Sequence, residues 1–466
     1  MIHVFNHYLS RRLVVLVGLE AVVLLLAARV GVSLIAGLQS TISAGDVGAP
    51  SEAAAAAFAL GMMVFMASMG LYKSDQWNDS RYVSARLVTP FALALSMVAL
   101  ITWVVPSLYP ELVLLAATTM TVALAGSLLV RIAFYRWQHL SAFKPRVLVL
   151  GTGSRITRLA EYAQRNPNYQ VVGYLATQPG KHYVPSPFVL ARAPGDSLLS
   201  IAERHGVEKI VVGVRDRRGG GLPVQELLEC KMKGIEVVEL PTFFEREYRQ
   251  VMLESLNPSW MVLGDGFRQG FFKNMLKRSF DVTVSIALLL VCLPVLLLAA
   301  ICIYLESGLP VLYRQERVGR GGRTFTLYKL RSMRQDAESN GTAQWAAAND
   351  DRTTRVGRFL RKSRIDELPQ IFNVLSGEMS FVGPRPERPV FVDQLAKQIP
   401  FYALRHGVKP GITGWAQVRY AYGASVDDAV EKLQHDLYYV KNNSLFLDVM
   451  ILIATMEVVL WGRGAR

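Results

Sequence analysis

Cysteine is scarce in this sequence of 466 residues, which contains three: Cys230, Cys292 and Cys302. None of them belongs to a Cys-x-x-Cys pair, and two lie in the same apolar run. A disulfide framework and a zinc site are therefore not expected, and this usage is typical of a reducing compartment.

Acidic residues are outnumbered, because 37 Asp and Glu stand against 51 Lys and Arg, for a net charge of +14. The histidines His406 and His435 have no neighbours at metal-ligand spacing. In a chain with membrane segments, a basic balance favours anionic lipid or phosphorylated substrates as partners, and not nucleic acid.

Long apolar runs are abundant by contrast, and apolar residues make up 51% of the chain. Four such runs lie at 13–38, 53–72, 87–105 and 112–134. Each reaches or approaches the ~20 residues that a helix needs to cross a bilayer. Arg11 and Arg12 precede the first run, the connection 39–52 has no Lys or Arg, and basic residues follow the fourth run. The positive-inside rule therefore predicts a four-helix transmembrane anchor over 1–143, with a cytoplasmic N-terminus and everything after residue 136 in the cytoplasm.

Two charged residues, Glu20 and Arg29, interrupt the first run. A polar relay through the membrane is one interpretation. A snorkelling helix end plus one interhelical hydrogen bond is the simpler one, and it is favoured. Four spans without a series of buried charges are typical of an anchor and not of a transporter.

Residues 144–256 alternate short apolar strands with helical stretches, which predicts a parallel, Rossmann-like α/β domain. The first strand, 146–150, is followed by Gly-Thr-Gly-Ser at 151–154. Ile156 replaces the third glycine of a dinucleotide-binding fingerprint, and Thr177 stands where an acidic residue would hold a ribose. A structural or regulatory module is favoured over a nucleotide site, and both interpretations stay open.

A fifth apolar run, 282–305, contains no charged residue and is long enough to span a bilayer. Both of its flanks are basic, so a full crossing would export a strongly basic segment, against the positive-inside bias. Pro294 lies at its centre, where a proline removes one backbone hydrogen bond and bends a helix. We predict a re-entrant membrane helix over 280–305, preceded by a linker or interfacial segment at 257–279.

Two adjacent carboxylates, Asp366 and Glu367, follow a basic run at 358–364. A second basic element, Pro384-Arg385-Pro386, comes soon after them. Acidic residues among excess arginines predict a site for a polyanion and a divalent cation, because Mg²⁺ is commonly held by one or two carboxylates plus substrate phosphates. The prolines on both sides of Arg385 restrict its backbone and reduce the entropy lost in placing the guanidinium.

Several motifs follow the bent run in order: YRQERVGRGGRTFTLYKLRSM at 313–333, DELPQ at 366–370, MSFVGPRP at 379–386, KPGITGWAQV at 409–418 and DLYYV at 436–440. With these motifs, residues 273–466 resemble the bacterial sugar transferases, the monotopic polyprenyl-phosphate phosphoglycosyl transferases. The front half is similar to the large-form members, which carry four helices and a CoA-binding-like Rossmann domain. The resemblance implies an α+β catalytic domain over 280–466 that contains the re-entrant helix.

The resemblance implies transfer of a sugar-1-phosphate from a UDP-sugar to undecaprenyl phosphate with release of UMP. This would be the first membrane step of exopolysaccharide or O-antigen synthesis at the bacterial inner membrane. Asp366 would be the nucleophile of an aspartyl–phosphosugar intermediate, which suits a carboxylate because it is ionised at neutral pH. Glu367 would hold the metal with Asp366 or polarise it, and Mg²⁺ is expected, with Mn²⁺ as the alternative. The implied substrate contacts are Lys329, Arg361, Arg385 with its flanking Pro384 and Pro386, Gln417 and Asp436.

One departure from the family pattern is Leu293, which stands where the family often has Ser before the re-entrant proline. A membrane-bound nucleotide-sugar dehydratase or epimerase is an alternative, but it needs a Tyr-x-x-x-Lys pair, which this sequence lacks. A non-catalytic scaffold of polysaccharide assembly is the third hypothesis. The sequence does not identify the sugar, and a homodimer is an arrangement that the apolar anchor and the extra sheet domain would suit.

Overall fold

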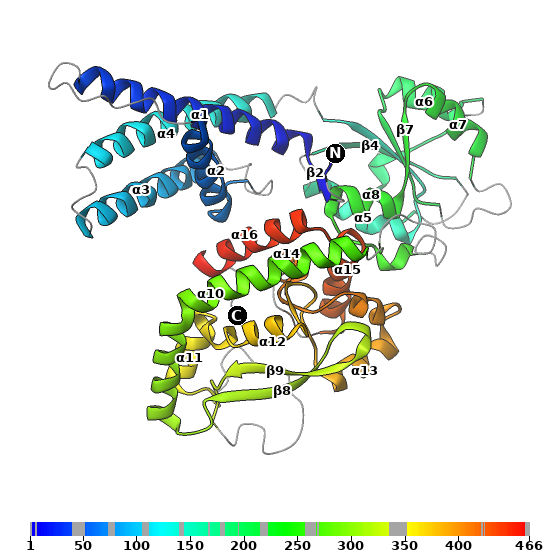
Figure 1. Ribbon diagram of the computed structural model, residues 1–466. Helices are drawn as coiled ribbons and strands as arrows, with labels where there is room; N and C mark the ends of the chain where they lie inside the picture. The colour runs from blue at the N-terminus through cyan, green and yellow to red at the C-terminus, as the bar shows by residue number, and fades with distance from the viewer. Residues whose placement is uncertain are drawn as a thin grey trace. The chain divides into compact units, whose positions relative to one another are not determined.

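The chain divides into two compact units in the computed structural model, one formed by 1–135 with 265–466 and the other by 136–264. The structure describes residues 2–4, 7–39, 52–72, 80–104, 111–138, 144–165, 168–177, 182–193, 195–214, 222–256, 267, 270–334, 352–420, 423 and 425–461 (Figure 1).

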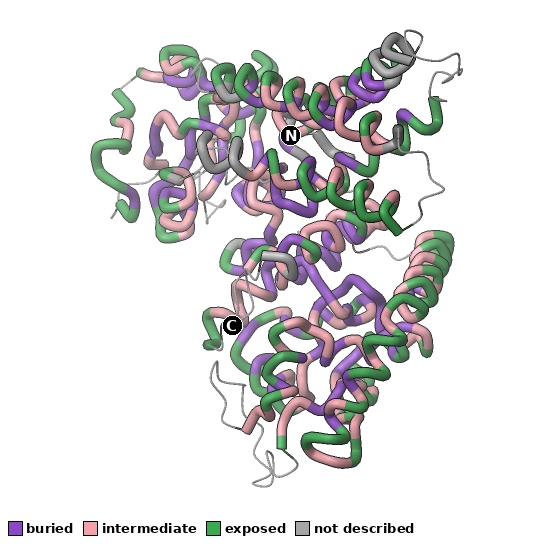
Figure 2. The backbone as a smooth tube through the Cα atoms, turned by 90° about the vertical axis from the view of Figure 1, so that its left-hand side faces the viewer, coloured by how far each residue is buried: buried purple, intermediate pink, exposed green. Residues whose placement is uncertain are grey.

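The anchor begins with a short antiparallel hairpin of β1 (Ile2–Val4) and β2 (His7–Leu9). Its helices are α1 (Arg11–Gln39), α2 (Glu52–Ser68), α3 (Ser80–Val104) and α4 (Glu111–Gln138). Three of them contain segments long and apolar enough to cross a membrane: Arg12–Gly31, Arg86–Val104 and Val113–Phe134. The second predicted run forms the shorter apolar helix α2, of 17 residues. In these three segments only 17–28% of the residues are buried, and the exposed remainder is largely apolar, as expected for lipid contact (Figure 2).

Glu20 is fully buried and forms an ion pair with Arg131 of α4, with Arg131 Nε 2.6 Å from Glu20 Oε1. Arg131 Nη1 also donates to the carbonyl of Leu71 at 3.0 Å, just after α2 ends. Arg29 instead pairs with Glu52 in an exposed position. The two charges of the first run therefore have separate partners, and the Glu20 pair joins three segments of the anchor.

The second unit is built on a five-stranded parallel sheet in the order β5-β4-β3-β6-β7. Its strands are β3 (Arg146–Leu150), β4 (Gln170–Leu175), β5 (Val189–Leu190), β6 (Lys209–Val212) and β7 (Glu236–Glu239). Its helices are α5 (Ser154–Arg165), α6 (Leu198–Arg204), α7 (Val224–Met232) and α8 (Leu240–Tyr248). The central strand is buried from Val147 to Leu150 and side chains pack against both faces, so an unbroken apolar strand is required here. The prediction of a parallel sheet is confirmed.

The remaining part of the first unit starts with α10 (Phe271–Ser307), one helix of 37 residues with Pro294 inside it. Figure 1 shows that α10 changes direction along its length. It is the fourth described helix that is long and apolar enough to cross a membrane, and 17% of its span is buried. Of the predicted linker 257–279, residues 257–266, 268 and 269 lie outside the described residues, and residues 271–279 belong to α10, which therefore begins before the predicted start of the membrane helix at residue 280.

The rest of this region surrounds a two-stranded antiparallel hairpin, β8 (Leu312–Val318) and β9 (Thr324–Leu330), and a parallel pair, β10 (Ser380–Val382) and β11 (Gly411–Thr413). The helices are α11 (Arg355–Lys362), α12 (Gln370–Ser376), α13 (Pro389–Gln398), α14 (Trp415–Arg419), α15 (Val426–Asn442) and α16 (Leu445–Trp461).

The first half of α10 is attached to this region by polar side chains. Lys277 Nζ lies 2.6 Å from Asp448 Oδ2 of α16. Arg278 donates to the carbonyls of Val374 and Leu375, which end α12. Asp281 is buried and accepts hydrogen bonds from the Ser380 hydroxyl and the Phe381 N–H of β10. The first half of α10 is therefore bound directly to α12, β10 and α16. Arg331 closes the other end of α10, where its Nη2 donates to the carbonyls of Ser307 and Gly308.

Candidate active site

The acidic pair lies in a single turn of 3₁₀ helix, η6 (Ile365–Glu367), between α11 and α12. The helical pattern of 354–375 predicts one continuous run, but α11 ends at Lys362, and Arg364 with φ +59° turns the chain before η6 begins. Pro369 then stands directly before α12, where it lacks the N–H that a continuing helix would use. Both carboxylates are held in a short turn as a result, and each is less than one tenth exposed.

Glu367 is surrounded by cations from three segments. Its Oε1 accepts hydrogen bonds from Lys329 Nζ of β9 at 2.9 Å and from Arg385 Nη2 at 2.6 Å. Arg364 Nη1 lies 3.8 Å from the same oxygen. Burial acts to raise the pKa of Glu367, but Arg385 and Lys329 outweigh it and hold the pKa well below its usual value. Glu367 is therefore an ionised carboxylate that fixes the Lys329 and Arg385 side chains.

Asp366 has a different environment from its neighbour. Its Oδ1 is buried and has no hydrogen-bond partner among the described residues. Burial, followed by the charge of Glu367, raises the pKa of Asp366 to about 6. A buried carboxylate oxygen without a partner is costly unless something binds there. Asp366 is thus the member of the pair with an oxygen available to a metal ion or a phosphorus atom.

Among the described residues, no group of three or more His, Cys, Asp and Glu side chains is placed to hold a metal ion. Asp366 and Glu367 fit the sparser pattern in which one or two carboxylates share a hard cation with substrate phosphates. The unpaired Oδ1 of Asp366 is the observation that fits such an ion best.

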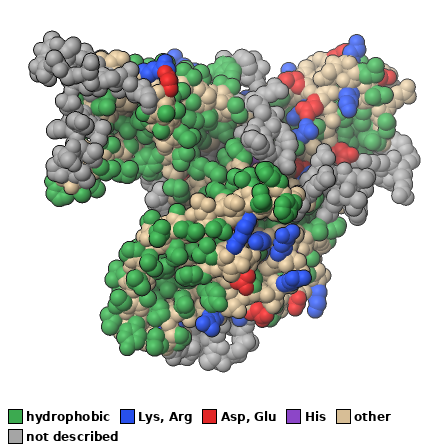
Figure 3. Space-filling view, viewed as in Figure 1, with side chains coloured by type: hydrophobic (Ala, Val, Ile, Leu, Met, Phe, Trp, Pro, Cys, Tyr) green, Lys and Arg blue, Asp and Glu red, His purple; other side chains and the backbone are tan. Residues whose placement is uncertain are grey.

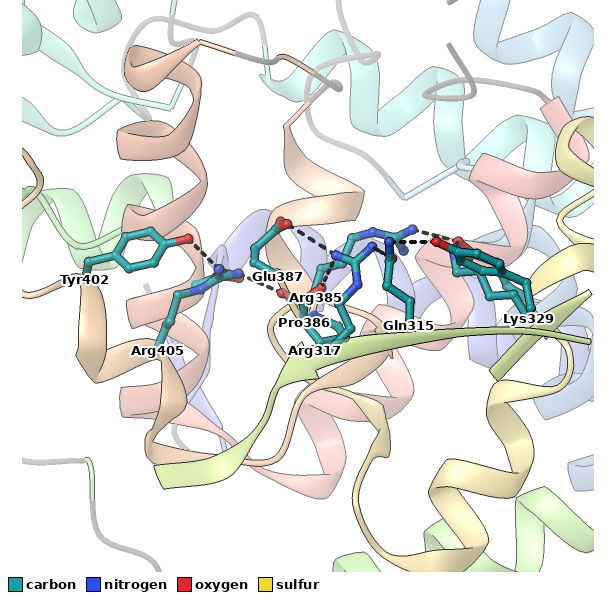
Figure 4. A network of polar contacts seen from close by, with 11 residues as sticks. Gln315, Arg317, Lys329, Arg385, Pro386, Glu387, Tyr402 and Arg405 are labelled. Carbon is teal, nitrogen blue, oxygen red and sulfur yellow. Dashed lines mark hydrogen bonds and ion pairs between the residues drawn. The ribbon is translucent and has the colours of Figure 1, made fainter. Parts of the chain in front are cut away.

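Arg385 reaches the acidic pair from the loop after β10 (Figure 4). Glycines allow two backbone segments to approach closely beside this loop. A Cβ on Gly383 would lie 2.3 Å from the Lys409 carbonyl oxygen, and one on Gly411 would lie 2.1 Å from the Gly383 nitrogen. The motifs at 379–386 and 409–418 therefore form one packed unit, which explains the two glycines.

Three predicted site residues make other contacts. Arg361 donates to the Thr353 hydroxyl at 3.2 Å. Gln417 Nε2 donates to the Ile412 carbonyl at 3.4 Å, and its buried Oε1 has no partner among the described residues. Asp436 is buried on α15, and its Oδ2 accepts hydrogen bonds from Arg405 at 2.8 and 3.1 Å. The structure therefore brings Lys329 and Arg385 to the acidic pair, whereas Asp436 contacts Arg405, which in turn contacts the Arg385 carbonyl.

The sequence interpretation did not single out Arg317 or Arg405, which both contact the backbone beside Arg385. Arg317 lies within the quoted motif at 313–333, so its place in the motif was the available signal. Arg405 had no local signal, because its partner Asp436 follows 31 residues later in the chain. Arg364, which ends the basic run before the pair, also approaches Glu367.

The surface around this region is divided by side-chain type. Figure 3 shows hydrophobic side chains gathered over one part of this region and Lys and Arg side chains over another. The second half of α10 exposes Leu297, Leu298, Ile301, Tyr304 and Leu305, each by more than half. A polar site beside an exposed apolar arm is suited to a reaction between a water-soluble and a membrane-bound reactant.

Comparisons with known proteins agree with this geometry. The sequence profile of the family described as bacterial sugar transferase matches residues 272–462. A UDP-N-acetylgalactosamine-undecaprenyl-phosphate N-acetylgalactosaminephosphotransferase of Aeromonas hydrophila is 40% identical over 302 residues, covering 65% of this chain and 69% of that protein. A UDP-glucose:undecaprenyl-phosphate glucose-1-phosphate transferase of Xanthomonas campestris pv. campestris is 34% identical over 342 residues, covering 69% of this chain and 67% of that protein. A protein of the same name from Escherichia coli (strain K12) is 41% identical over 186 residues, which are 39% of each chain. The chain belongs to the bacterial sugar transferase family.

Proposed function

We propose that this enzyme transfers a sugar-1-phosphate from a UDP-sugar to undecaprenyl phosphate and releases UMP, as the first membrane step of exopolysaccharide or O-antigen synthesis. Family membership and the names of the relatives support the reaction. The observation that carries the proposal is the buried acidic pair, in which cations hold Glu367 while Asp366 keeps an unpaired oxygen. The relatives act on different sugars by name, so the sugar is left open.

In the proposed mechanism Asp366 is the nucleophile. Its carboxylate oxygen attacks the phosphorus next to the sugar, a new O–P bond forms, and the bond to the uridine-bearing phosphate breaks with release of UMP. An oxygen of undecaprenyl phosphate then attacks the same phosphorus, and the Asp366 carboxylate leaves. With a pKa of about 6, Asp366 is ionised in most molecules at neutral pH while it stays more basic than a solvent-exposed Asp.

The charge on the transferred phosphate is met by cations. Arg385 and Lys329 lie on the Glu367 side of the pair and would contact the phosphates of the donor. Asp366 and Glu367 would also hold Mg²⁺ or Mn²⁺, which when bound neutralises part of the diphosphate charge. Arg361, Gln417, Pro384 and Pro386 remain candidates for the walls of the donor site.

The proposed location is the bacterial inner membrane, with the N-terminus and the catalytic residues in the cytoplasm. The apolar helices and the basic flanks of α10 support this orientation. Pro294 inside α10 supports a re-entrant arm that returns to the cytoplasmic side. A cysteine in place of the exposed Leu309, just after α10, is expected to react with a membrane-impermeant thiol reagent only from the cytoplasmic side. Labelling from the periplasm would contradict the re-entrant arm.

The reaction is tested with the full chain in detergent or nanodiscs, a panel of UDP-sugars, undecaprenyl phosphate and Mg²⁺, with UMP release as the readout. We expect release with at least one sugar, and a loss of at least about 10³-fold in Asp366→Asn, the scale of removing a covalent nucleophile. The matched control is Asp393→Asn, which removes an exposed carboxylate on α13 and should leave the rate unchanged. An Asp366→Asn variant as fast as the parent would rule out the aspartyl intermediate.

A further inference from the structure

Four consecutive backbone carbonyls around Arg385 each accept one hydrogen bond from a different partner. The donors are Gly411 N to Pro384 O at 3.0 Å, Arg405 Nη2 to Arg385 O at 2.9 Å, Arg317 Nη1 to Pro386 O at 3.0 Å and Val318 N to Glu387 O at 2.9 Å. Prolines 384 and 386 have no N–H, so this segment cannot be held by a regular strand ladder. The segment is held through its backbone carbonyl oxygens, and two of the four groups that donate hydrogen bonds to them are guanidinium groups (Figure 4).

Arg405 is itself fixed before it reaches the Arg385 carbonyl. It is 6% exposed, two of its nitrogens donate to Asp436 Oδ2, and its Nη1 donates to the Tyr402 hydroxyl at 2.8 Å. A buried guanidinium must be paired to be tolerated, and Asp436 supplies that charge. The ring of Tyr402 also lies 5.2 Å from the guanidinium carbon. Arg405 Nη2 also donates to the backbone carbonyl of Arg385. The Arg405–Asp436 pair is therefore connected to the loop that carries Arg385.

The loop in turn fixes where the Arg385 guanidinium lies. Arg385 Nη2 donates to Glu367 at 2.6 Å, and its side chain is 29% exposed. It can therefore contact both the acidic pair and a phosphate that arrives from solvent. The productive placement of such a group is narrow, because an error of about 1 Å can cost ~10²-fold in rate.

We infer, on the basis of the proposed function, that Arg405 with Asp436 is a positioning device that sets Arg385 for the donor phosphates. Arg405 acts through the Arg385 carbonyl and does not touch the substrate. Asp436 holds Arg405, so the acidic residue that the sequence suggested as a substrate contact acts two residues away from the substrate. Arg317 supports the neighbouring carbonyl from β8.

The test is a double-mutant cycle between residues 405 and 385 in the full chain. Arg405→Lys keeps the charge for Asp436 but loses the planar fork that reaches the carbonyl. In the parent background, we expect Arg405→Lys to lower kcat/KM for UMP release by about 10-fold or more. We expect it to weaken UDP binding, measured by calorimetry, by a similar factor. In an Arg385→Ala background the same change should cost less than about 3-fold, because the group that it positions is gone. If Arg405→Lys lowers kcat/KM and UDP affinity by the same factor in both backgrounds, the inference is wrong.

A matched control is Arg278→Lys. Arg278 also donates its guanidinium to two backbone carbonyls, but these belong to Val374 and Leu375 of α12 and not to the segment 384–387. Any loss that it causes should be the same in both backgrounds. If thermal unfolding shows that Arg405→Lys does not fold, Tyr402→Phe removes one anchoring contact without a charge change and takes its place in the cycle. The double-mutant cycle can also be measured from UDP binding alone, without turnover. If the parent releases no UMP, the proposed reaction is refuted, but the UDP affinities still test whether Arg405 positions Arg385.

Discussion

The Glu367→Gln substitution tests whether Glu367 and Asp366 have different roles in the proposed reaction. In the structure Glu367 Oε1 holds Lys329 at 2.9 Å and Arg385 at 2.6 Å. In the proposed mechanism the phosphates of a bound donor contact the same two cations, so the carboxylate and the donor would compete for them. Glutamine has nearly the same shape but carries no charge. We therefore expect Glu367→Gln to bind UDP more tightly than the parent in the absence of metal, while its rate of UMP release falls.

The expected gain in UDP affinity can be worked out from the positions of Lys329 and Arg385. Two unit charges 4 Å apart interact by about 4 kcal/mol in surroundings typical of a protein surface and by about 1 kcal/mol in water. The Lys329 and Arg385 side chains are 19% and 29% exposed, so they lie between these limits. The free-energy cost of desolvating the incoming phosphate offsets part of its attraction to the two cations. A net gain of about 1–2 kcal/mol corresponds to UDP binding that is about 5–30-fold tighter.

Calorimetric titration with UDP in EDTA measures this gain directly. The control is Glu378→Gln, which removes a carboxylate that accepts from Asn373 Nδ2 at 2.8 Å in the same domain. It should leave UDP affinity unchanged. If Glu367→Gln binds UDP no more tightly than the parent, Glu367 does not compete with phosphates for these cations. Repeating the titration in Mg²⁺ tests its second assignment, since loss of a metal ligand would make added Mg²⁺ strengthen UDP binding less in the variant than in the parent.

Three other outcomes are expected. Glu20→Gln leaves Arg131 buried and unpaired, so it should destabilise the anchor by about 3–5 kcal/mol in thermal unfolding, and a double replacement of the pair by Leu should recover most of that loss; equal melting of the single and double variants would contradict this. The N-cap serine of α15 lowers the pKa of Asp428 to about 2, so the contribution of Asp428 is complete above about pH 4 and is lost as the pH falls toward 2. Asp428→Asn should therefore cost up to about 1 kcal/mol at pH 7 and at pH 5, and progressively less as the pH falls from about 4 toward 2, and a cost independent of pH would argue against it. Pro294→Ala should straighten α10 and make a cysteine at residue 309 reactive from the periplasm, whereas unchanged labelling would show that the proline does not set the path.

Local patterns in the sequence were sufficient to predict the membrane helices and the parallel sheet. Apolar runs of about 20 residues and short apolar strands each report on one element and its immediate surroundings. The run at 53–72 shows the limit of this approach, because it yields a helix of 17 residues, α2, followed by a turn. The turn is used by Arg131, whose side chain binds the Leu71 carbonyl from α4.

The candidate site was predictable only in part, for a related reason. The adjacency of Asp366 and Glu367 is visible in the sequence, and their crowding by arginines suggests an anion site. The 3₁₀ turn is not visible, because Arg364 at φ +59° is an uncommon conformation for an arginine. The Arg405–Asp436 pair depends on the packing of α15 against the segment 402–407, which no short motif encodes.

The environment of the acidic pair explains why two neighbouring carboxylates can perform different functions. A continuous helix would have presented them about 100° apart on a common surface, with similar access to solvent. In the turn, both are buried, and the pair is distinguished by its partners. The cations at Glu367 lower its pKa, whereas burial, followed by the charge of Glu367, raises the pKa of Asp366. Glu367 holds Lys329 and Arg385, while Asp366 keeps an unpaired oxygen and a raised pKa, which suits the attack on phosphorus that we propose for it.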